Sequence, residues 1–151
     1  YYADCVPLFF LDPEHRAVGL AHAGWRGTVA KIGQVMVQRL AEEFDSRPEA
    51  LFVGIGPSIG PCCYEVDTPV AKQFAALESL SPEGFLKEKG EGKYLLNLWE
   101  CNRRILLDAG ILPEHLSVGK VCTKCHSDLL YSHRVMGVER GSLAAMICVM
   151  E

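Results

Sequence analysis

Apolar and polar positions change along the chain in blocks that predict alternating strands and helices. Two apolar runs, residues 6–12 and 17–23, flank the tetrad DPEH. A proline at the second position of such a tetrad favours a turn. From about residue 28 to residue 44 the apolar residues recur at helical spacing. The pattern predicts a β-hairpin followed by a long helix.

The rest of the chain continues this alternation without an internal repeat or a low-complexity tract. Residues 51–55 predict a buried strand that runs into the loop GPSIGPCC, and residues 116–121 and 143–149 predict two further strands. Residues 68–77 and 96–109 predict helices, the second of which stops at Gly110. We therefore predict a mixed α/β (α+β) fold whose strands need not all be parallel.

The DPEH turn sets the register of the predicted hairpin. If the turn is centred between Pro13 and Glu14, paired positions sum to 27, and Cys5 faces His22. Directly opposite residues in an antiparallel pair have Cβ atoms about 4.5–5.5 Å apart. A thiol and an imidazole at that separation can share a proton or a metal ion. Alternatively, Cys5 is a small buried apolar side chain and His22 a hydrogen-bonded core histidine.

The residues after His22, AGWRGT, occur where a strand passes into a helix. Such a junction points backbone N–H groups toward any bound anion, and Arg26 adds a planar cation suited to phosphate or carboxylate. The alternative is that the glycines only permit a tight turn and Arg26 faces solvent.

Length and composition limit the class of protein. The 151 residues are 49% hydrophobic, which is enough for one compact domain over residues 1–151. The net charge of -4 does not favour nucleic-acid binding, and no apolar run approaches the roughly 20 residues of a membrane span. Seven cysteines, an odd number, indicate a reducing compartment. We expect a cytoplasmic protein with small-molecule or protein partners, neither nucleic acid nor membrane.

Two further motifs carry candidate chemistry. CTKCH at 122–126 is half of a structural zinc site, whose other half would come from Cys62, Cys63 or Cys101. A redox pair is an alternative, although no helix start follows the first cysteine. We interpret these cysteines as structural or incidental, since no second spaced pair exists. YSHR places His133 and Arg134 near a strand end or in a surface turn.

The loop GIGPSIGP is not a phosphate loop of the Walker or Rossmann kind. Pro57 and Pro61 remove backbone donors, and no helix with a phosphate-binding lysine follows. We interpret this loop as a wall of the substrate pocket, with Cys62, Cys63 and Tyr64 pointing into the pocket or packing behind the loop.

These motifs resemble one family along the whole chain. ADCVPLFF, GLAHAGWRGT, VGIGPSIGPCCYEV, LLYSHR and LAAMICV occur in the order found in the bacterial YfiH family, also called the laccase-domain or multicopper polyphenol oxidase family. The resemblance implies a purine nucleoside phosphorylase for adenosine, inosine and methylthioadenosine, with adenosine deaminase activity. It also implies a fold similar to cytotoxic necrotizing factor, a cysteine-histidine deamidase.

The resemblance further implies a zinc or copper ion held by a His-Cys-His set. Its cysteine and second histidine correspond to Cys5 and His22, while the first histidine belongs to an upstream Q-x-H-G motif that this chain does not contain. The chain thus resembles the C-terminal part of a longer family chain. Because a catalytic Zn²⁺ takes three protein ligands, we expect Zn²⁺ or Cu²⁺ to bind weakly or not at all here. His126 and His133 are the candidate substitutes.

Several mechanisms fit the same pair of residues. In the first, a metal on Cys5 and His22 polarises water or phosphate, while Arg26 or Arg134 holds the anion. In the second, Cys5 is a metal-independent nucleophile assisted by His22, as in cysteine hydrolases. A third is a catalytically silent module. Copper oxidation of phenols comes last, because the chain has too few clustered histidines for several copper ions. The preferred interpretation is the purine nucleoside phosphorylase, with the oligomeric state open.

Overall fold

The main sheet of the protein has four strands in the order β2-β1-β3-β7, in a computed structural model that describes residues 1–150. The predicted hairpin is formed by β1 (Val6–Asp12) and β2 (Ala17–Ala23), and β3 (Phe52–Ile55) pairs antiparallel with β1. β7 (Leu116–Val118) lies parallel to β3 and is shorter than the predicted strand. The sheet is mixed, as expected.

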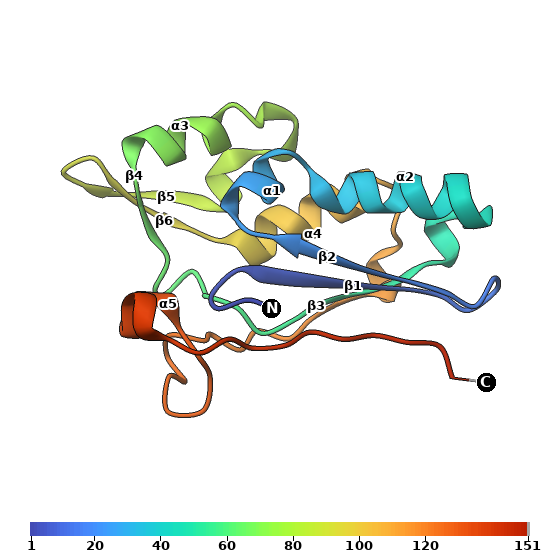
Figure 1. Cartoon of the computed structure of the whole chain (residues 1–151). Helices are drawn as coiled ribbons and strands as arrows, with labels where there is room; N and C mark the ends of the chain where they lie inside the picture. The colour runs from blue at the N-terminus through green and yellow to red at the C-terminus, as the bar shows by residue number, and fades with distance from the viewer. Residues whose placement is uncertain (151) are drawn as a thin grey trace.

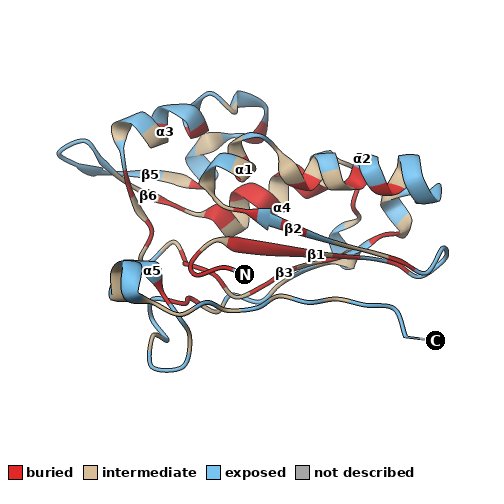
Figure 2. Cartoon of the chain, in the orientation of Figure 1, coloured by how far each residue is buried: buried red, intermediate tan, exposed pale blue. Residues whose placement is uncertain are grey.

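Three helices cover one face of this sheet (Figure 1): α1 (Trp25–Val29), α2 (Ile32–Phe44) and α4 (Leu98–Asp108). Because side chains alternate along a strand, Leu8 and Phe10 of β1 both point toward these helices. Both are fully buried, and Figure 2 shows β1 as the most continuously buried strand. This layer is the centre of the core.

The long helix predicted over 28–44 is two helices. Lys31 has a left-handed backbone (φ 53°, ψ 43°), which interrupts the helix between Val29 and Ile32. The first helix starts earlier than predicted, directly after Gly24, because the Thr28 backbone N–H already donates to the Gly24 carbonyl at 2.8 Å. The break turns α2 along the sheet and leaves α1 beside the end of β2.

A second, antiparallel sheet of three strands was not predicted. Its order is β4 (Glu65–Asp67), β6 (Lys93–Leu96) and β5 (Leu86–Gly90), and α3 (Thr68–Ala75) lies beside it, within the predicted helix. The β5 residues are largely exposed and charged, so they lack the apolar alternation that marks a half-buried strand.

The remaining elements are short. They are α5 (His133–Met136) and the 3-10 turns η1 (Pro48–Ala50), η2 (Glu78–Leu80), η3 (Pro82–Gly84), η4 (Pro113–His115) and η5 (Gly137–Glu139). None of the helices in the described residues is long and apolar enough to cross a bilayer.

The strand predicted over 143–149 is wrong. Leu143 forms a single bridge with Tyr2, after which the chain runs extended across the face of the sheet opposite the helices (Figure 1). A segment lying across a face, rather than along an edge, finds no row of free backbone groups to pair with. The apolar residues that suggested a strand therefore remain partly exposed, Met146 among them.

The hairpin register differs from the prediction by two residues. Asp12 pairs with Ala17 and Pro7 with His22, so paired positions sum to 29. The loop has four residues rather than two, because the Asp12 carboxylate accepts hydrogen bonds from the backbone N–H groups of Glu14 (2.8 Å) and His15 (3.1 Å). A shift of two residues keeps every side chain on its predicted face.

Candidate functional site

Cys5 and His22 converge on one point although they are not directly opposite. Extending the observed register places Gly24 opposite Cys5. A methyl group on Gly24 would lie 3.0 Å from the Cys5 sulfur and 3.6 Å from His22 Nε2. The predicted direct pairing is wrong, but the thiol and the imidazole share one side of the hairpin and border the same small space.

The surroundings of the pair differ between the two side chains. His22 is exposed, so the alternative of a core histidine is wrong, while Cys5 is half-buried. Burial raises the pKa of the Cys5 thiol, the Asp4 carboxylate raises it further, and Arg140 lowers it. Sequence reasoning missed Arg140, which lies far along the chain and carries no motif.

Asp4 is a second residue that sequence reasoning missed. It is buried, has a left-handed backbone (φ 74°), and accepts hydrogen bonds from Thr123 Oγ1 at 2.6 Å and from the Arg134 backbone N–H at 2.8 Å. Its own carbonyl accepts from the Ile59 N–H at 2.9 Å. Asp4 thus fixes the backbone before Cys5 against three distant segments.

Arg26 lies in the five-residue helix α1 and is exposed. Its guanidinium lies 4.2 Å from the centre of the Trp25 ring, within cation–π range. The alternative of a solvent-facing arginine therefore describes its position in this structure.

Trp25 also lines a cavity of about 310 Å³. Trp25 and Tyr64 supply its aromatic walls, and Lys93 and Arg134 its cations, with Glu65 and Asp67 also at the rim. The Arg134 guanidinium lies 4.9 Å from the centre of the Tyr64 ring. Tyr64, Glu65 and Val66 are thus the residues of the GPSIGPCCYEV segment that line this cavity, and that it is the substrate pocket stays a prediction.

His133 stands apart from this cavity, on the exposed start of α5, where its Nδ1 accepts a 3.4 Å hydrogen bond from Arg140 Nε. In residues 1–150 no third histidine, cysteine or carboxylate joins Cys5 and His22 in a group of metal-ligand spacing. The candidate substitutes His126 and His133 therefore do not complete the set in this structure.

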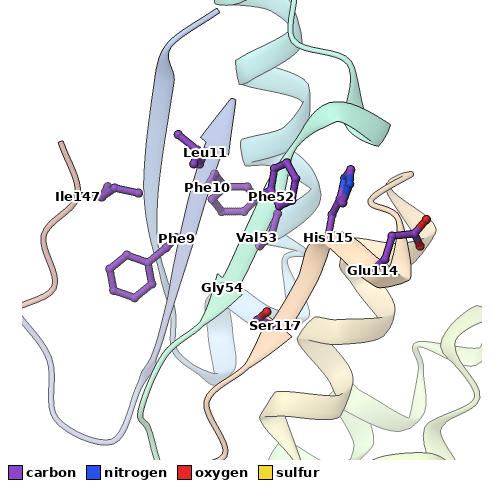
Figure 3. A pocket seen from close by; sticks show the side chains of 10 residues that line it. All are labelled: Phe9, Phe10, Leu11, Phe52, Val53, Gly54, Glu114, His115, Ser117 and Ile147. Carbon is purple, nitrogen blue, oxygen red and sulfur yellow. The ribbon is translucent and has the colours of Figure 1, made fainter. Parts of the chain in front are cut away.

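The sheet face opposite the helices carries a different hollow, of about 270 Å³ (Figure 3). His115 stacks on Phe52 there, with ring centres 4.0 Å apart, and Phe9 and Ile147 line the opposite wall. None of the predicted site residues lines it. The predicted site residues and this apolar hollow therefore lie in different parts of the molecule.

The structure also brings two further cysteines to those of CTKCH. Cys62 and Cys63 lie with Cys122 and Cys125 in one group, whereas Cys101 is buried in α4. Burial and contacts with neighbouring thiols raise the pKa of Cys62 to about 12. Burial also acts to raise the pKa of Cys122, but hydrogen bonds, led by that from the Gly60 N–H, bring it down to about 7.

Comparisons with known proteins agree on one family. The family model described as "Multi-copper polyphenol oxidoreductase laccase" matches residues 1–150. The chain is 42% identical over 150 residues to "Purine nucleoside phosphorylase YlmD" of Bacillus subtilis, covering 99% of this chain and 54% of the relative. It is 29% identical over 139 residues to "Adenosine deaminase RL5" from an unknown prokaryotic organism, covering 92% and 53%.

A solved structure agrees with this match. The crystal structure of the hypothetical protein YfiH from Bacillus licheniformis superposes with a TM-score of 0.84 at 41% identity, covering 88% of this chain and 50% of that one. The chain spans about half the length of the curated relatives it matches. With the fold, the family model and the relatives in agreement, this chain belongs to the YfiH or laccase-domain family.

Proposed function

We propose that this chain carries the catalytic part of a purine nucleoside phosphorylase acting on adenosine, inosine and methylthioadenosine. In this reaction a phosphate oxygen bonds to the anomeric carbon of the sugar as the bond from that carbon to the purine nitrogen breaks. The purine leaves with the bonding electron pair and takes up a proton. The observation that carries the proposal is the convergence of Cys5 and His22, in a family whose relatives have this activity in their names.

The donor set at Cys5 and His22 fits Zn²⁺ or copper, because thiolate and imidazole are the ligands these ions prefer. The sulfur and Nε2 lie 3.0 Å and 3.6 Å from one point, the position of a Cβ built on Gly24, and His22 is exposed. A bound ion would supply Lewis-acid polarisation of phosphate or water. Two ligands are fewer than the three of a catalytic zinc site, so we expect weak binding by this chain alone.

The cavity beside Trp25 suits the substrate. Trp25 and Tyr64 supply aromatic contacts for a purine base, and Arg134 supplies a cation at the same cavity for phosphate. Arg26 lies over Trp25, which lines the cavity, and His133 accepts a hydrogen bond from Arg140, whose charge acts on Cys5. We assign anion binding to Arg26, Arg134 and His133, and metal binding to Cys5 and His22.

Deamination of adenosine is the proposed side activity, since one relative is named an adenosine deaminase. Water would attack the purine carbon that bears the amino group, and ammonia would leave.

The test compares this chain with a chain extended upstream to the length of the relatives, each with and without Cys5→Ser. Serine keeps the shape of cysteine but is a poorer zinc ligand than thiolate, so phosphorolysis of inosine and adenosine should fall about 10- to 100-fold and recover partly in excess Zn²⁺. Removal of the metal by a chelator should abolish phosphorolysis by the chains that keep Cys5. Released purine measures the rate.

Retained turnover after chelation, with a covalent adduct on Cys5 found by mass spectrometry, would replace this proposal by the metal-independent cysteine hydrolase. Failure of both chains to turn over a nucleoside at saturating Zn²⁺ would support the silent module instead.

A further inference from the structure

Four cysteine sulfurs meet outside the Cys5 and His22 site. Cys62 and Cys63 lie in the turn between β3 and β4, while after β7 Cys122 forms a single bridge with Ser58 and Cys125 lies in the turn that follows. All four Sγ atoms are within 4.8 Å of one another. Cys125 Sγ lies 3.6 Å from Cys62 Sγ and 3.5 Å from Cys63 Sγ. Two loops about 60 positions apart in the sequence therefore present four thiols to one point.

This spacing suits a single tetrahedral ion. A Zn–S bond is about 2.3 Å, so tetrahedral geometry places ligand sulfurs about 3.8 Å apart. The contacts at Cys125 are close to that value, and no pair in the group exceeds 4.8 Å. An iron–sulfur cluster must fit several irons and sulfides between its cysteines and needs a wider set.

A disulfide uses only part of this arrangement. It would join two sulfurs at about 2.05 Å and leave the other two thiols without a role. Cys62 and Cys63 also approach Cys125 almost equally, so the geometry singles out neither as a partner. An ion bound by four thiolates uses every member of the group.

The backbone around the group is built for close approach to sulfur. The Gly60 N–H donates to Cys122 Sγ at 3.2 Å. A Cβ on Gly60 would lie 2.8 Å from the Trp99 ring and 3.3 Å from Cys62 Sγ, so a larger residue would push these groups apart. N–H donors to ligand atoms are the second-shell contacts that orient metal ligands.

We propose that Cys62, Cys63, Cys122 and Cys125 bind one Zn²⁺ as a structural site, separate from Cys5 and His22. Soft thiolates select Zn²⁺ over hard cations such as Mg²⁺, and a closed set of four leaves no position for substrate.

The proposed ion would join the two loops that support the candidate active site. Thr123, next to Cys122, donates to Asp4, and Tyr64, next to Cys63, faces the cavity beside Trp25. The backbones of the two loops also meet directly, since Thr123 N–H donates to the Ser58 carbonyl at 3.1 Å. Zinc at this point acts on position and stability rather than on the reacting atoms.

The first experiment measures metal in this chain purified under reducing conditions with Zn²⁺ supplied. We expect about one zinc per chain by mass spectrometry of the metal, retained in Cys5→Ser and in the control Cys148→Ser, and reduced at least about tenfold in Cys125→Ser. Cys148 is an exposed cysteine outside the group, so its substitution controls for thiol loss. Retention in Cys5→Ser separates this site from the proposed active site.

The second experiment uses the unsubstituted chain and so does not depend on a variant that folds. Bound zinc should protect four cysteines, mapped as 62, 63, 122 and 125, from alkylation, and chelation should expose them together. Chelation should also lower Tm. Cobalt in place of zinc should give the absorption of a tetrahedral tetrathiolate.

Three results would overturn the proposal. They are zinc below about one tenth of an ion per chain under these conditions, zinc retained at full occupancy in Cys125→Ser, and a Cys125 disulfide in the reduced, zinc-supplied protein. Iron in place of zinc would overturn the choice of metal. None of these outcomes depends on nucleoside phosphorolysis, so the failure of one proposal leaves the other standing.

Discussion

Gly24 occupies the space between the two candidate metal ligands. Its backbone (φ -63°, ψ 175°) is accessible to any residue, so Gly24→Ala introduces no backbone strain. The new methyl would lie 3.0 Å from Cys5 Sγ and 3.6 Å from His22 Nε2, where an ion shared by both would bind. We expect inosine phosphorolysis by the upstream-extended chain to fall at least about tenfold, with little change in Tm.

Gly54→Ala is the matched control. A Cβ there would lie 3.9 Å from the nearest atom, Phe9 Cβ, so it should change neither activity nor Tm. Full activity in Gly24→Ala would show that no group essential to the reaction occupies the space between Cys5 and His22.

Asp12 links the hairpin loop to the pH dependence of stability. Its side chain is fully buried, which raises the pKa, but the Ser46 side chain, the His15 ring (2.8 Å) and the backbone N–H groups of Glu14 and His15 lower the pKa to about 2. The folded pKa lies below the ordinary 3.8, so the native state binds fewer protons. This contribution to stability is therefore present above about pH 4 and is lost as the pH falls toward 2.

Asp12→Asn tests that contribution. Asparagine keeps an acceptor for the backbone donors but cannot ionise, so we expect a loss of about 2 kcal/mol in the free energy of unfolding at pH 7. Urea unfolding at pH 7 and at pH 2–3 measures the difference, which should shrink at the lower pH. A difference that is equal at both pH values would mean that the Asp12 charge does not stabilise the fold.

At the scale of residues, motifs identified Cys5 and His22 as candidates, and the structure places them around one space. The predicted register of the hairpin was wrong, because the register depends on the number of residues in the turn. The hydrogen bonds to Asp12 set that number. Asp4 and Arg140 were missed because their roles come from distant contacts, such as that of Asp4 with Thr123. Such contacts have no local sequence signal.

At the scale of elements, a buried series of hydrogen bonds joins α4 to the end of β2. Asn102 Nδ2 donates to Thr28 Oγ1 at 3.0 Å and to the Leu98 carbonyl at 2.9 Å, and Thr28 Oγ1 donates to the Ala23 carbonyl at 3.2 Å. Both polar side chains are fully buried. The chain of bonds fixes α1 and the strand end that carries His22 against α4.

Asn102→Ala should destabilise the protein by about 1–3 kcal/mol, because it leaves a cavity and removes the donor to buried Thr28. The loss is measured by urea unfolding, with Gln38→Ala on the exposed side of α2 as the control, for which we expect a change within about 0.5 kcal/mol. Additive losses in Thr28→Ala, Asn102→Ala and the double variant would contradict coupling through this bond.

The strands of the hairpin follow the local pattern of apolar residues closely, whereas the break at Lys31 and the second sheet do not. The bounds of β1 and β2 match the predicted apolar runs, whereas the break at Lys31 depends on one left-handed residue. The second sheet was missed because its β5 strand is exposed and charged. The sequence offered Cys62, Cys63 and Cys101 as partners of the CTKCH cysteines but could not choose among them, since only the packed loops bring residues 62–63 beside 122–125.

At the scale of the whole molecule, the sheet is covered unequally on its two faces. Helices pack on one face, and the extended C-terminal segment crosses the other (Figure 1). Leu11, Leu20 and Phe52 remain 39–44% exposed. The covered face supplies the core, and the end of the hairpin beside that core carries Cys5 and His22.

The two sheets share one core, which has a consequence for unfolding. A single buried cluster includes Leu8 and Ile55 from the first sheet and Val66 and Leu96 from the second. Because neither sheet has a separate core, we expect one cooperative transition. Far-UV circular dichroism, which reports both sheets, and the fluorescence of Trp25 and Trp99, which lie in the helices on the first sheet, should give the same urea midpoint.

The measurement is made first without metal, with chelator and reductant present, because a tightly bound ion can uncouple the probes. Adding Zn²⁺ should then move both midpoints upward together, since an ion on the loops at 60–63 and 122–125 stabilises only the folded chain. Two separated transitions in the metal-free chain would mean that the β4-β6-β5 unit unfolds independently. A midpoint that rises for one probe alone would mean that zinc stabilises only the part of the molecule which that probe reports.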